Sequence, residues 1–142
     1  MPVSAFNKFN SFVEDVTEKV HNLGADSLKV MLTNTAPVAT NTIKANLTEI
    51  TAANGYTAGG TVATIASSAQ TSGTYKLVLN DVVFTATGAV GPFRYAVLYN
   101  DTPTSPADPL IGWWDNGAAV TLANTETFTV DFDPSAGVLT LV

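Results

Sequence analysis

The clearest pattern of hydrophobic positions lies between residues 91 and 133, where short strands follow one another at roughly even spacing. Within it, the segment 93–99 is apolar at nearly every position. A strand that is apolar on both faces lies in the middle of a sheet and is covered from both sides. We therefore expect 93–99 to be the central strand of the fold. Its predicted faces are Phe93, Tyr95, Val97 and Tyr99 on one side and Arg94, Ala96 and Leu98 on the other.

Further strands are predicted from apolar or alternating runs that end at turn-forming residues. Two pairs are expected to form hairpins, one around Asn80-Asp81 and a clearer one around Asn116-Gly117, because Asn-Gly suits a two-residue turn. Residues 52–60 form a glycine-rich turn, and residues 101–109, with three prolines, form an exposed loop. The predicted strands are 27–33, 61–66, 75–79, 82–87, 110–115, 118–122, 127–133 and 138–142, while 43–50 is ambiguous between a helical turn and a strand.

The first 24 residues have a different pattern, with apolar side chains at three- and four-residue steps. This spacing predicts a helix that ends near Gly24, a favourable C-terminal stop. The alternative is an extended arm through residues 5–10 that leads into a shorter helix. The helical stripe consists of Phe9, Phe12, Val13, Val16, Val20 and Leu23.

Eight to ten short strands in 142 residues predict a mainly β, single-domain fold. The architecture expected is a β-sandwich or jelly roll with a short N-terminal helix or arm. We divide the chain into an N-terminal arm or helix, residues 1–24, and a β-sandwich body, residues 25–142.

Charge narrows the range of partners. Only 13% of the residues are charged, and the six basic residues are scattered singly from Lys8 to Arg94. Without a basic patch to neutralise phosphates, we expect no nucleic-acid partner. No apolar run approaches the ~20 residues of a membrane span and no signal-peptide pattern is seen, so we expect no membrane partner. The net charge of −6 is interpreted as an aid to solubility.

The residues offer little for catalysis or metal binding. His21 is the only histidine and cysteine is absent, so the usual zinc sets cannot be built. We expect His21 at the surface near the helix end. Asp131 and Asp133 share one face of a strand, about 7 Å apart, and are interpreted as its solvent face rather than as a calcium or glycosidase pair. We therefore expect no enzyme activity and no cofactor.

Three features instead indicate protein contacts. Phe6, Phe9 and Phe12 either fill the core of the domain or dock onto a neighbouring subunit. Neighbours on a strand point to opposite faces, so one of Trp113 and Trp114 is expected in the core and the other exposed or covered. Arg94, on an apolar strand, is expected to pair with Asp115 or Asp131, or with a carboxylate of a partner. The candidate interface residues are therefore Phe6, Phe9, Phe12, Trp113, Trp114 and Arg94.

Several stretches together resemble a family of small virion proteins of tailed bacteriophages. They are FNKFNSFVEDVTEKVHNLGADSLKVMLTN, TEITAANGYTAGG, GPFRYAVLYND, PLIGWWDNG and FTVDFDPSAGVLTL, which cover nearly the whole chain in order. The resemblance implies a head decoration, or cement, protein that stabilises the capsid from its outer surface. The implied partners are the major capsid protein and copies of the chain itself, with a trimer favoured. The implied location is the virion exterior, after synthesis in the host cytoplasm.

Two other functions are compatible with the sequence. The first is a receptor- or glycan-binding β-sandwich of a tail fibre or adhesin, which would use the loop 101–109 and the ring of Trp113 or Trp114. The second is a tail-tube or connector subunit, which would form rings or stacks rather than coat a shell.

Overall fold

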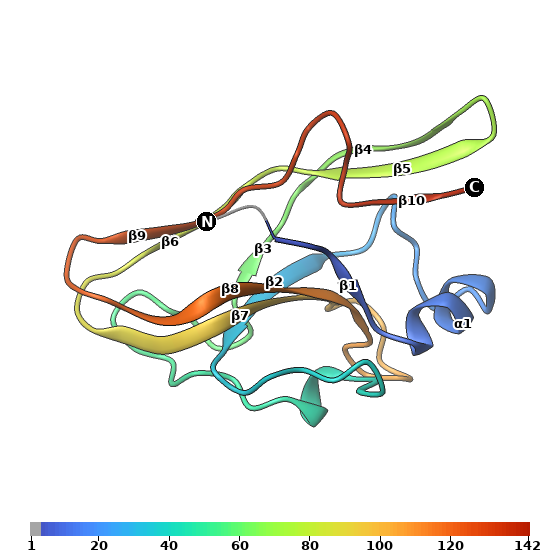
Figure 1. Ribbon diagram of the computed structural model, residues 1–142. Helices are drawn as coiled ribbons and strands as arrows, with labels where there is room; N and C mark the ends of the chain where they lie inside the picture. Colours follow the sequence, from blue (N-terminus) through green and yellow to red (C-terminus); the bar gives the residue numbers. More distant parts are fainter. Residues whose placement is uncertain (1–3) are drawn as a thin grey trace.

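Five strands form the larger sheet of the computed structural model, which describes residues 4–142 (Figure 1). All pairings within it are antiparallel. The central strand is β7, as predicted for residues 93–99, and its neighbours β8 and β2 flank it over most of its length. The strands in order across the sheet are β1 (Asn7–Lys8), β8 (Leu110–Leu122), β7 (Val90–Asn100), β2 (Leu28–Thr33) and β3 (Thr61–Val62).

Two smaller antiparallel sheets form the second layer, and the result is the predicted mainly β, sandwich-like domain. Figure 1 shows them on the same side of the larger sheet, with β6 and β9 at one end and β4, β5 and β10 at the other. The three-stranded sheet has the order β10 (Leu139–Leu141), β5 (Thr74–Leu79) and β4 (Ile65–Thr71), and the two-stranded sheet pairs β6 (Val82–Thr85) with β9 (Thr127–Val130).

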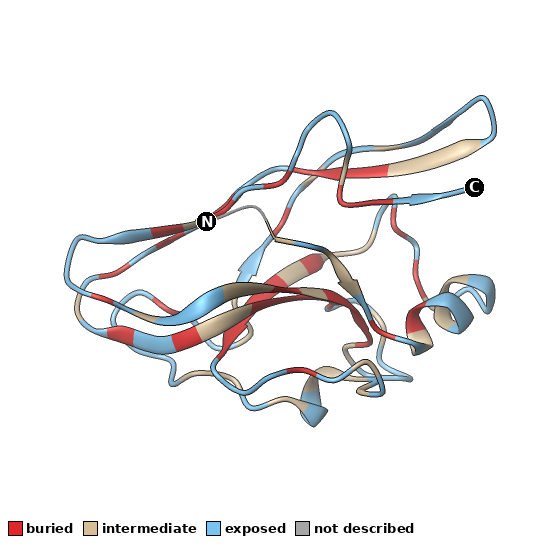
Figure 2. Cartoon of the chain, viewed as in Figure 1, coloured by how far each residue is buried: buried red, intermediate tan, exposed pale blue. Residues whose placement is uncertain are grey.

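The larger sheet is buried on both faces, as expected for a central strand without a polar side (Figure 2). Its inner face packs against the smaller sheets and forms the main core, which includes Leu98 and Phe93. A second cluster packs on the opposite face. It contains Phe9, Met31, Val97, Tyr99 and Leu110, with Leu47 and Trp113 at its margin.

One detail of the predicted faces of β7 is wrong. Phe93 belongs to the main core together with Ala96 and Leu98, and not to the cluster of Val97 and Tyr99. The pairing with β8 is irregular between Phe93 and Tyr95. A bulge adds residues to one strand and changes the face on which the following side chains lie, so strict alternation fails across it.

The N-terminal segment follows the alternative prediction of an arm and a shorter helix. Its arm pairs as β1 with β8, and α1 spans only Ser11–Thr17. Lys19, with a φ of 68°, takes the left-handed conformation that commonly ends a helix. The predicted helix end at Gly24 is therefore wrong. Leu23 is buried in the main core from a segment that is not helical.

Neither predicted hairpin is formed. Asn80-Asp81 connects β5 to β6, which lie in different sheets, so the two strands do not pair. Asn116-Gly117 lies inside the continuous strand β8. Gly117 has a φ of 88°, and its N–H donates a hydrogen bond to Asp115 Oδ1 at 2.8 Å. The positive φ and the side-chain hydrogen bond, which are typical of turns, thus form a bulge within β8 and do not reverse the chain.

The remaining predictions agree with the structure in most respects. The segment 61–66 is divided between β3 and β4, and a 3₁₀ turn at Lys44–Asn46 occupies the ambiguous region 43–50. Residues 52–60 form the expected turn, with positive φ at Asn54, Gly55, Gly59 and Gly60. The turn is fixed to β2 by the Tyr56 hydroxyl, which donates to Glu49 Oε1 at 2.7 Å and accepts the Leu32 N–H at 3.0 Å.

Candidate functional site

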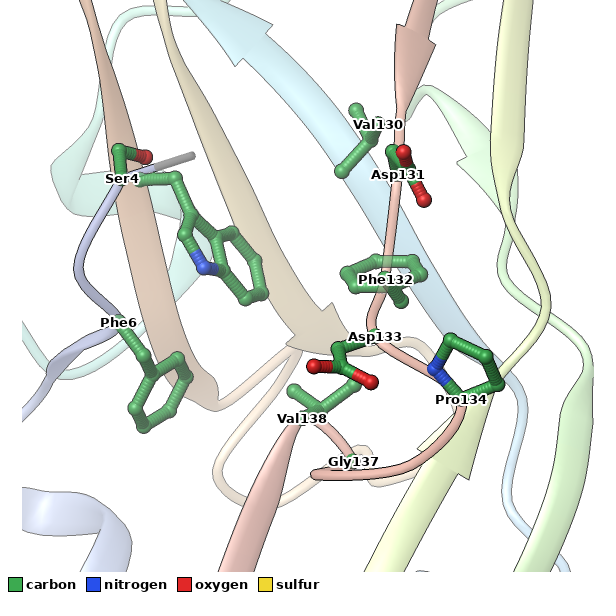
Figure 3. Close-up of a pocket in the computed structure, with 10 residues that line it drawn as sticks. Ser4, Phe6, Val130, Asp131, Phe132, Asp133, Pro134, Gly137 and Val138 are labelled. Carbon is green, nitrogen blue, oxygen red and sulfur yellow. The ribbon is translucent and has the colours of Figure 1, made fainter. Parts of the chain in front are cut away.

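An open cleft of about 440 Å³ lies between the N-terminal arm and the segment that links β9 to β10 (Figure 3). Its walls combine aromatic rings with two aspartates, the mixture of apolar and polar groups typical of ligand sites. Its central lining residues are Ser4, Phe6, Trp114, Asp131, Phe132 and Asp133.

The aromatic side of the cleft is built from three segments that are far apart in the sequence. The ring centroid of Trp114, on β8, lies 5.4 Å from that of Phe6 and 5.5 Å from that of Phe132. Gly112 makes room for this arrangement, because a methyl group there would overlap the Phe6 ring. Trp114 and Phe132 are buried, so the cleft shows only parts of their rings.

The polar side of the cleft comes from Asp131 and Asp133, which lie beyond the end of β9 at Val130. Figure 3 shows the Asp133 carboxylate directed into the space between Phe6 and Phe132. Its Oδ1 accepts the N–H groups of Ala136 at 3.1 Å and Ser135 at 2.7 Å. These two bonds hold the pKa of Asp133 below its usual value, so the carboxylate is ionised at neutral pH.

This arrangement suits a ligand with donor groups, such as hydroxyls, beside a small apolar surface. Asp131 and Asp133 are exposed, as predicted, but the cleft they border was not predicted. One part of the cleft is indicated by the sequence: the alternation of apolar and polar residues through Phe132 predicts that this ring is buried. The contact with Phe6 depends on the arm crossing β8, which no local pattern indicates.

The two tryptophans lie on opposite faces, as predicted. Trp114 belongs to the main core, while Trp113 is half-buried on the other face, with its ring centroid 4.6 Å from that of Phe9. Trp113 is therefore covered in part by Phe9 of the domain's own N-terminal segment.

The three phenylalanines differ in what they can offer to a partner. Phe9 is 0% exposed and Phe12 is 2% exposed, so both rings fill the core of the domain. Phe6 is half-buried against Trp114 at the cleft. Neither Phe9 nor Phe12 can contact a partner while the domain stays folded, so Phe6 is the one of the three that can take part in docking.

Arg94 pairs with Asp115, one of the two carboxylates predicted for it. The guanidinium donates from Nε to Oδ1 at 2.8 Å and from Nη2 to Oδ2 at 3.0 Å. The side chain of Arg94 is 40% exposed, which places the pair at the surface. These hydrogen bonds hold the pKa of Asp115 below its usual value.

His21 is buried, which contradicts the predicted surface position. Its Nδ1 accepts a hydrogen bond from Asn100 Nδ2 at 3.0 Å, and the same amide donates to Asp26 Oδ2 at 2.7 Å. Its ring packs on Phe12 at 5.3 Å between centroids. Burial lowers the pKa of His21 to about 4. This network joins the N-terminal segment to the end of β7, and no spacing in the sequence indicates it.

Within residues 4–142, no group of three or more His, Cys, Asp or Glu side chains is placed to hold a metal ion. No helix in the same range is long and apolar enough to cross a membrane. Comparisons with protein-family models, with curated proteins and with solved structures find no match to this chain.

Proposed function

We propose that the chain is a bacteriophage virion structural protein that decorates the outer surface of the capsid shell. It stabilises the shell as an oligomer, with the major capsid protein as its partner. The proposal combines the resemblance of the sequence to small tailed-phage virion proteins with one observation on the folded domain, the distribution of charge along the sandwich edge.

The observation that carries the proposal is an edge without charge. No charged residue occurs between Glu49 and Lys76, although the chain carries 18 charged residues in all, 12 acidic and 6 basic. This stretch supplies β3 and β4, which lie at the edges of the two largest sheets. Val62 on β3 is 45% exposed. Burying β3 and β4 against another protein takes no charged side chain of these two strands out of water, which favours a permanent contact.

A decoration protein acts through many weak sites on one particle. Each bound copy bridges neighbouring shell subunits and adds contact area that opposes expansion of the shell. Because hundreds of sites respond together, a modest free energy at each site gives a large effect on the particle. A sandwich with both faces of its main sheet buried suits this purely mechanical role.

The test is to mix the purified protein with expanded, undecorated capsids and to image them by cryo-electron microscopy. We expect density in regular clusters on the outer surface and a raised melting temperature of the capsid. Val62→Lys is expected to weaken binding at least about tenfold, because it places a charge in the interface. Val83→Lys is the matched control, since Val83 is similarly exposed, at 50%, on β6. Bare capsids, or equal binding by both variants, would contradict the proposal.

The cleft favours glycan binding as a second candidate function. Aromatic side chains beside the ionised Asp133 provide both an apolar contact and acceptors for sugar hydroxyls. We expect Asp133→Asn to lower the affinity for any cell-surface polysaccharide found on a glycan array, because the amide is a weaker acceptor than the carboxylate. Glu18→Gln, an exposed residue outside both the cleft and the loop 101–109, is the control. An array without saturable binding would eliminate this candidate.

A further inference from the structure

The edge strand β4 is open along its outer side within the part of the chain that the structure describes. It runs from Ile65 to Thr71 at one edge of the three-stranded sheet. Figure 1 shows β4 and β5 extending beyond the larger sheet, and Figure 2 shows most of β4 exposed. Open N–H and C=O groups along such a strand form a ready template for another strand.

Natural proteins usually protect such edges with charged residues, prolines or bulges. The sequence of β4, IASSAQT, contains neither a charge nor a proline. Its one irregularity lies between Ile65 and Ser67, so the segment from Ser67 to Thr71 is a regular strand. Its side chains are small or uncharged, which lets a second backbone approach. The outer edge of β4 therefore lacks the usual protection and can form main-chain hydrogen bonds with another strand.

The hairpin at the end of β4 determines which backbone groups point outward. Ser72 and Gly73 have φ of 50° and 82°, the signature of a two-residue type I′ turn. Thr71 and Thr74 close the turn, so the backbone groups of Thr71 point toward β5. Because hydrogen-bonding direction alternates along an antiparallel strand, Ser68 and Gln70 present their N–H and C=O groups outward.

We propose that this edge binds the β4 edge of a second copy of the chain, antiparallel and around a two-fold axis at Ala69. Ser68 of each copy then faces Gln70 of the other, and these two pairs exchange four main-chain hydrogen bonds. The pairing joins two three-stranded sheets into one sheet of six strands. A two-fold contact uses the same patch on both copies and closes as a dimer, in place of the trimer that the family resemblance implies.

The distribution of charge favours a second copy of the chain as the partner of the β4 edge. Each copy carries a net charge of −6, so two copies repel each other over most of their surface. The β4 edge lies within the stretch that has no acidic residue, and the nearest charge on the hairpin is Lys76, opposite Ala69 on β5. Identical chains therefore meet here with the least repulsion. This inference goes beyond capsid decoration, because the pairing requires no capsid.

A single cysteine tests the geometry directly, because the chain has none of its own. At the two-fold axis the Ala69 residues form a pair without hydrogen bonds, with Cα atoms about 4.5 Å apart, which a disulfide can bridge. We expect Ala69→Cys to form a disulfide-linked dimer under mild oxidation. The exposed Ala119→Cys, on β8, should not. Equal cross-linking of the two variants would overturn the proposal.

A second pair of variants tests the hydrogen bonds without oxidation. Gln70→Pro removes an outward N–H and leaves the bonds to β5 in place, whereas Gln70→Thr keeps that N–H. In sedimentation velocity experiments on the full chain, we expect Gln70→Pro to weaken the dimer at least about tenfold relative to Gln70→Thr. A wild-type monomer at all concentrations, a trimer, or a dimer that Gln70→Pro leaves intact would overturn the pairing. Capsid binding, measured separately, tests only the decoration role.

Discussion

Replacing Gly60 with alanine is expected to lower the free energy of unfolding by more than about 4 kcal/mol, enough to prevent folding of a marginally stable domain. Gly60 has a φ of 80° and immediately precedes β3. A Cβ at this position would lie 2.6 Å from the carbonyl carbon of Val30 and 2.9 Å from the Cα of Met31. Both are backbone atoms of the buried strand β2, so neither can move aside without disturbing the larger sheet.

Gly73→Ala is the matched control for this prediction. Gly73 has a φ of 82°, nearly the same as Gly60, but nothing lies within 4 Å of the position that its Cβ would occupy. This variant carries only the backbone strain of a left-handed alanine, roughly 1–2 kcal/mol. Urea unfolding followed by circular dichroism measures both variants. Losses that agree within experimental error would show that the close approach to Val30 contributes nothing.

Acidification from pH 6.5 to 4 is expected to lower the stability of the protein through His21. Burial lowers the pKa of this imidazole from 6.5 to about 4 in the folded state. Because the unfolded chain then binds the proton more tightly, the stabilisation is complete above pH 6.5 and is lost as the pH falls toward 4. The shift corresponds to a loss of about 3 kcal/mol.

The hydrogen bonds give this pH dependence its structural cause. Asn100 Oδ1 accepts the Thr102 N–H, which orients the amide so that its Nδ2 faces His21 Nδ1. A proton added at Nδ1 would meet this amide N–H. Asp15, 4.0 Å from His21 Nε2, and Asp26, beyond Asn100, are the acidic groups that face the ring region. Asp26 attracts a charged imidazole and so opposes the effect of burial, but burial has the larger effect on the pKa of His21.

The measurement is simple because the chain has one histidine. A titration followed by NMR should give a folded-state pKa near 4 for His21, and urea unfolding should show the loss between pH 6.5 and 4. His21→Gln keeps an acceptor for Asn100 and does not titrate, so its stability should fall much less over this interval. The remaining slope comes from carboxylates such as Asp115 and Asp133, whose pKa values are lowered in the folded state. An NMR pKa close to 6.5, or the same pH dependence in His21→Gln, would refute the prediction.

Most of the strands could be predicted from the sequence, but which strands pair with one another could not. Alternating runs predicted most of the outer strands and a continuous apolar run predicted the central β7, because burial determines which positions of a strand are apolar. The hairpins at Asn80-Asp81 and Asn116-Gly117 were wrong since turn-forming residues also serve crossovers and bulges. Lys19 ends α1 without glycine, which made the helix appear longer than it is.

The candidate site was harder to predict for the same reason. Trp114, Phe6 and Phe132 are neighbours only because β1 pairs with β8 and the segment after β9 crosses Trp114. His21 likewise gains its hydrogen-bond partner, Asn100, from 79 positions away in the sequence. Local sequence patterns predict which residues are buried and where turns occur. They do not predict these contacts, which depend on the pairing of strands that are distant in the sequence. For Arg94 the sequence indicates Asp115, Asp131 or a carboxylate of a partner chain, and only the fold shows that Asp115 is the partner.

The order of strands in the larger sheet also has a consequence for synthesis. Leu28 at the start of β2 pairs with Asn100, 72 residues later in the chain. At about 5–20 residues per second, a ribosome takes roughly 4–14 s to cover that interval. During this time β2, which is buried along nearly its whole length in the finished domain, has no β7 to pair with. The nascent chain therefore exposes an apolar strand without a partner, and we expect the soluble yield to rise when a chaperone covers that strand during synthesis.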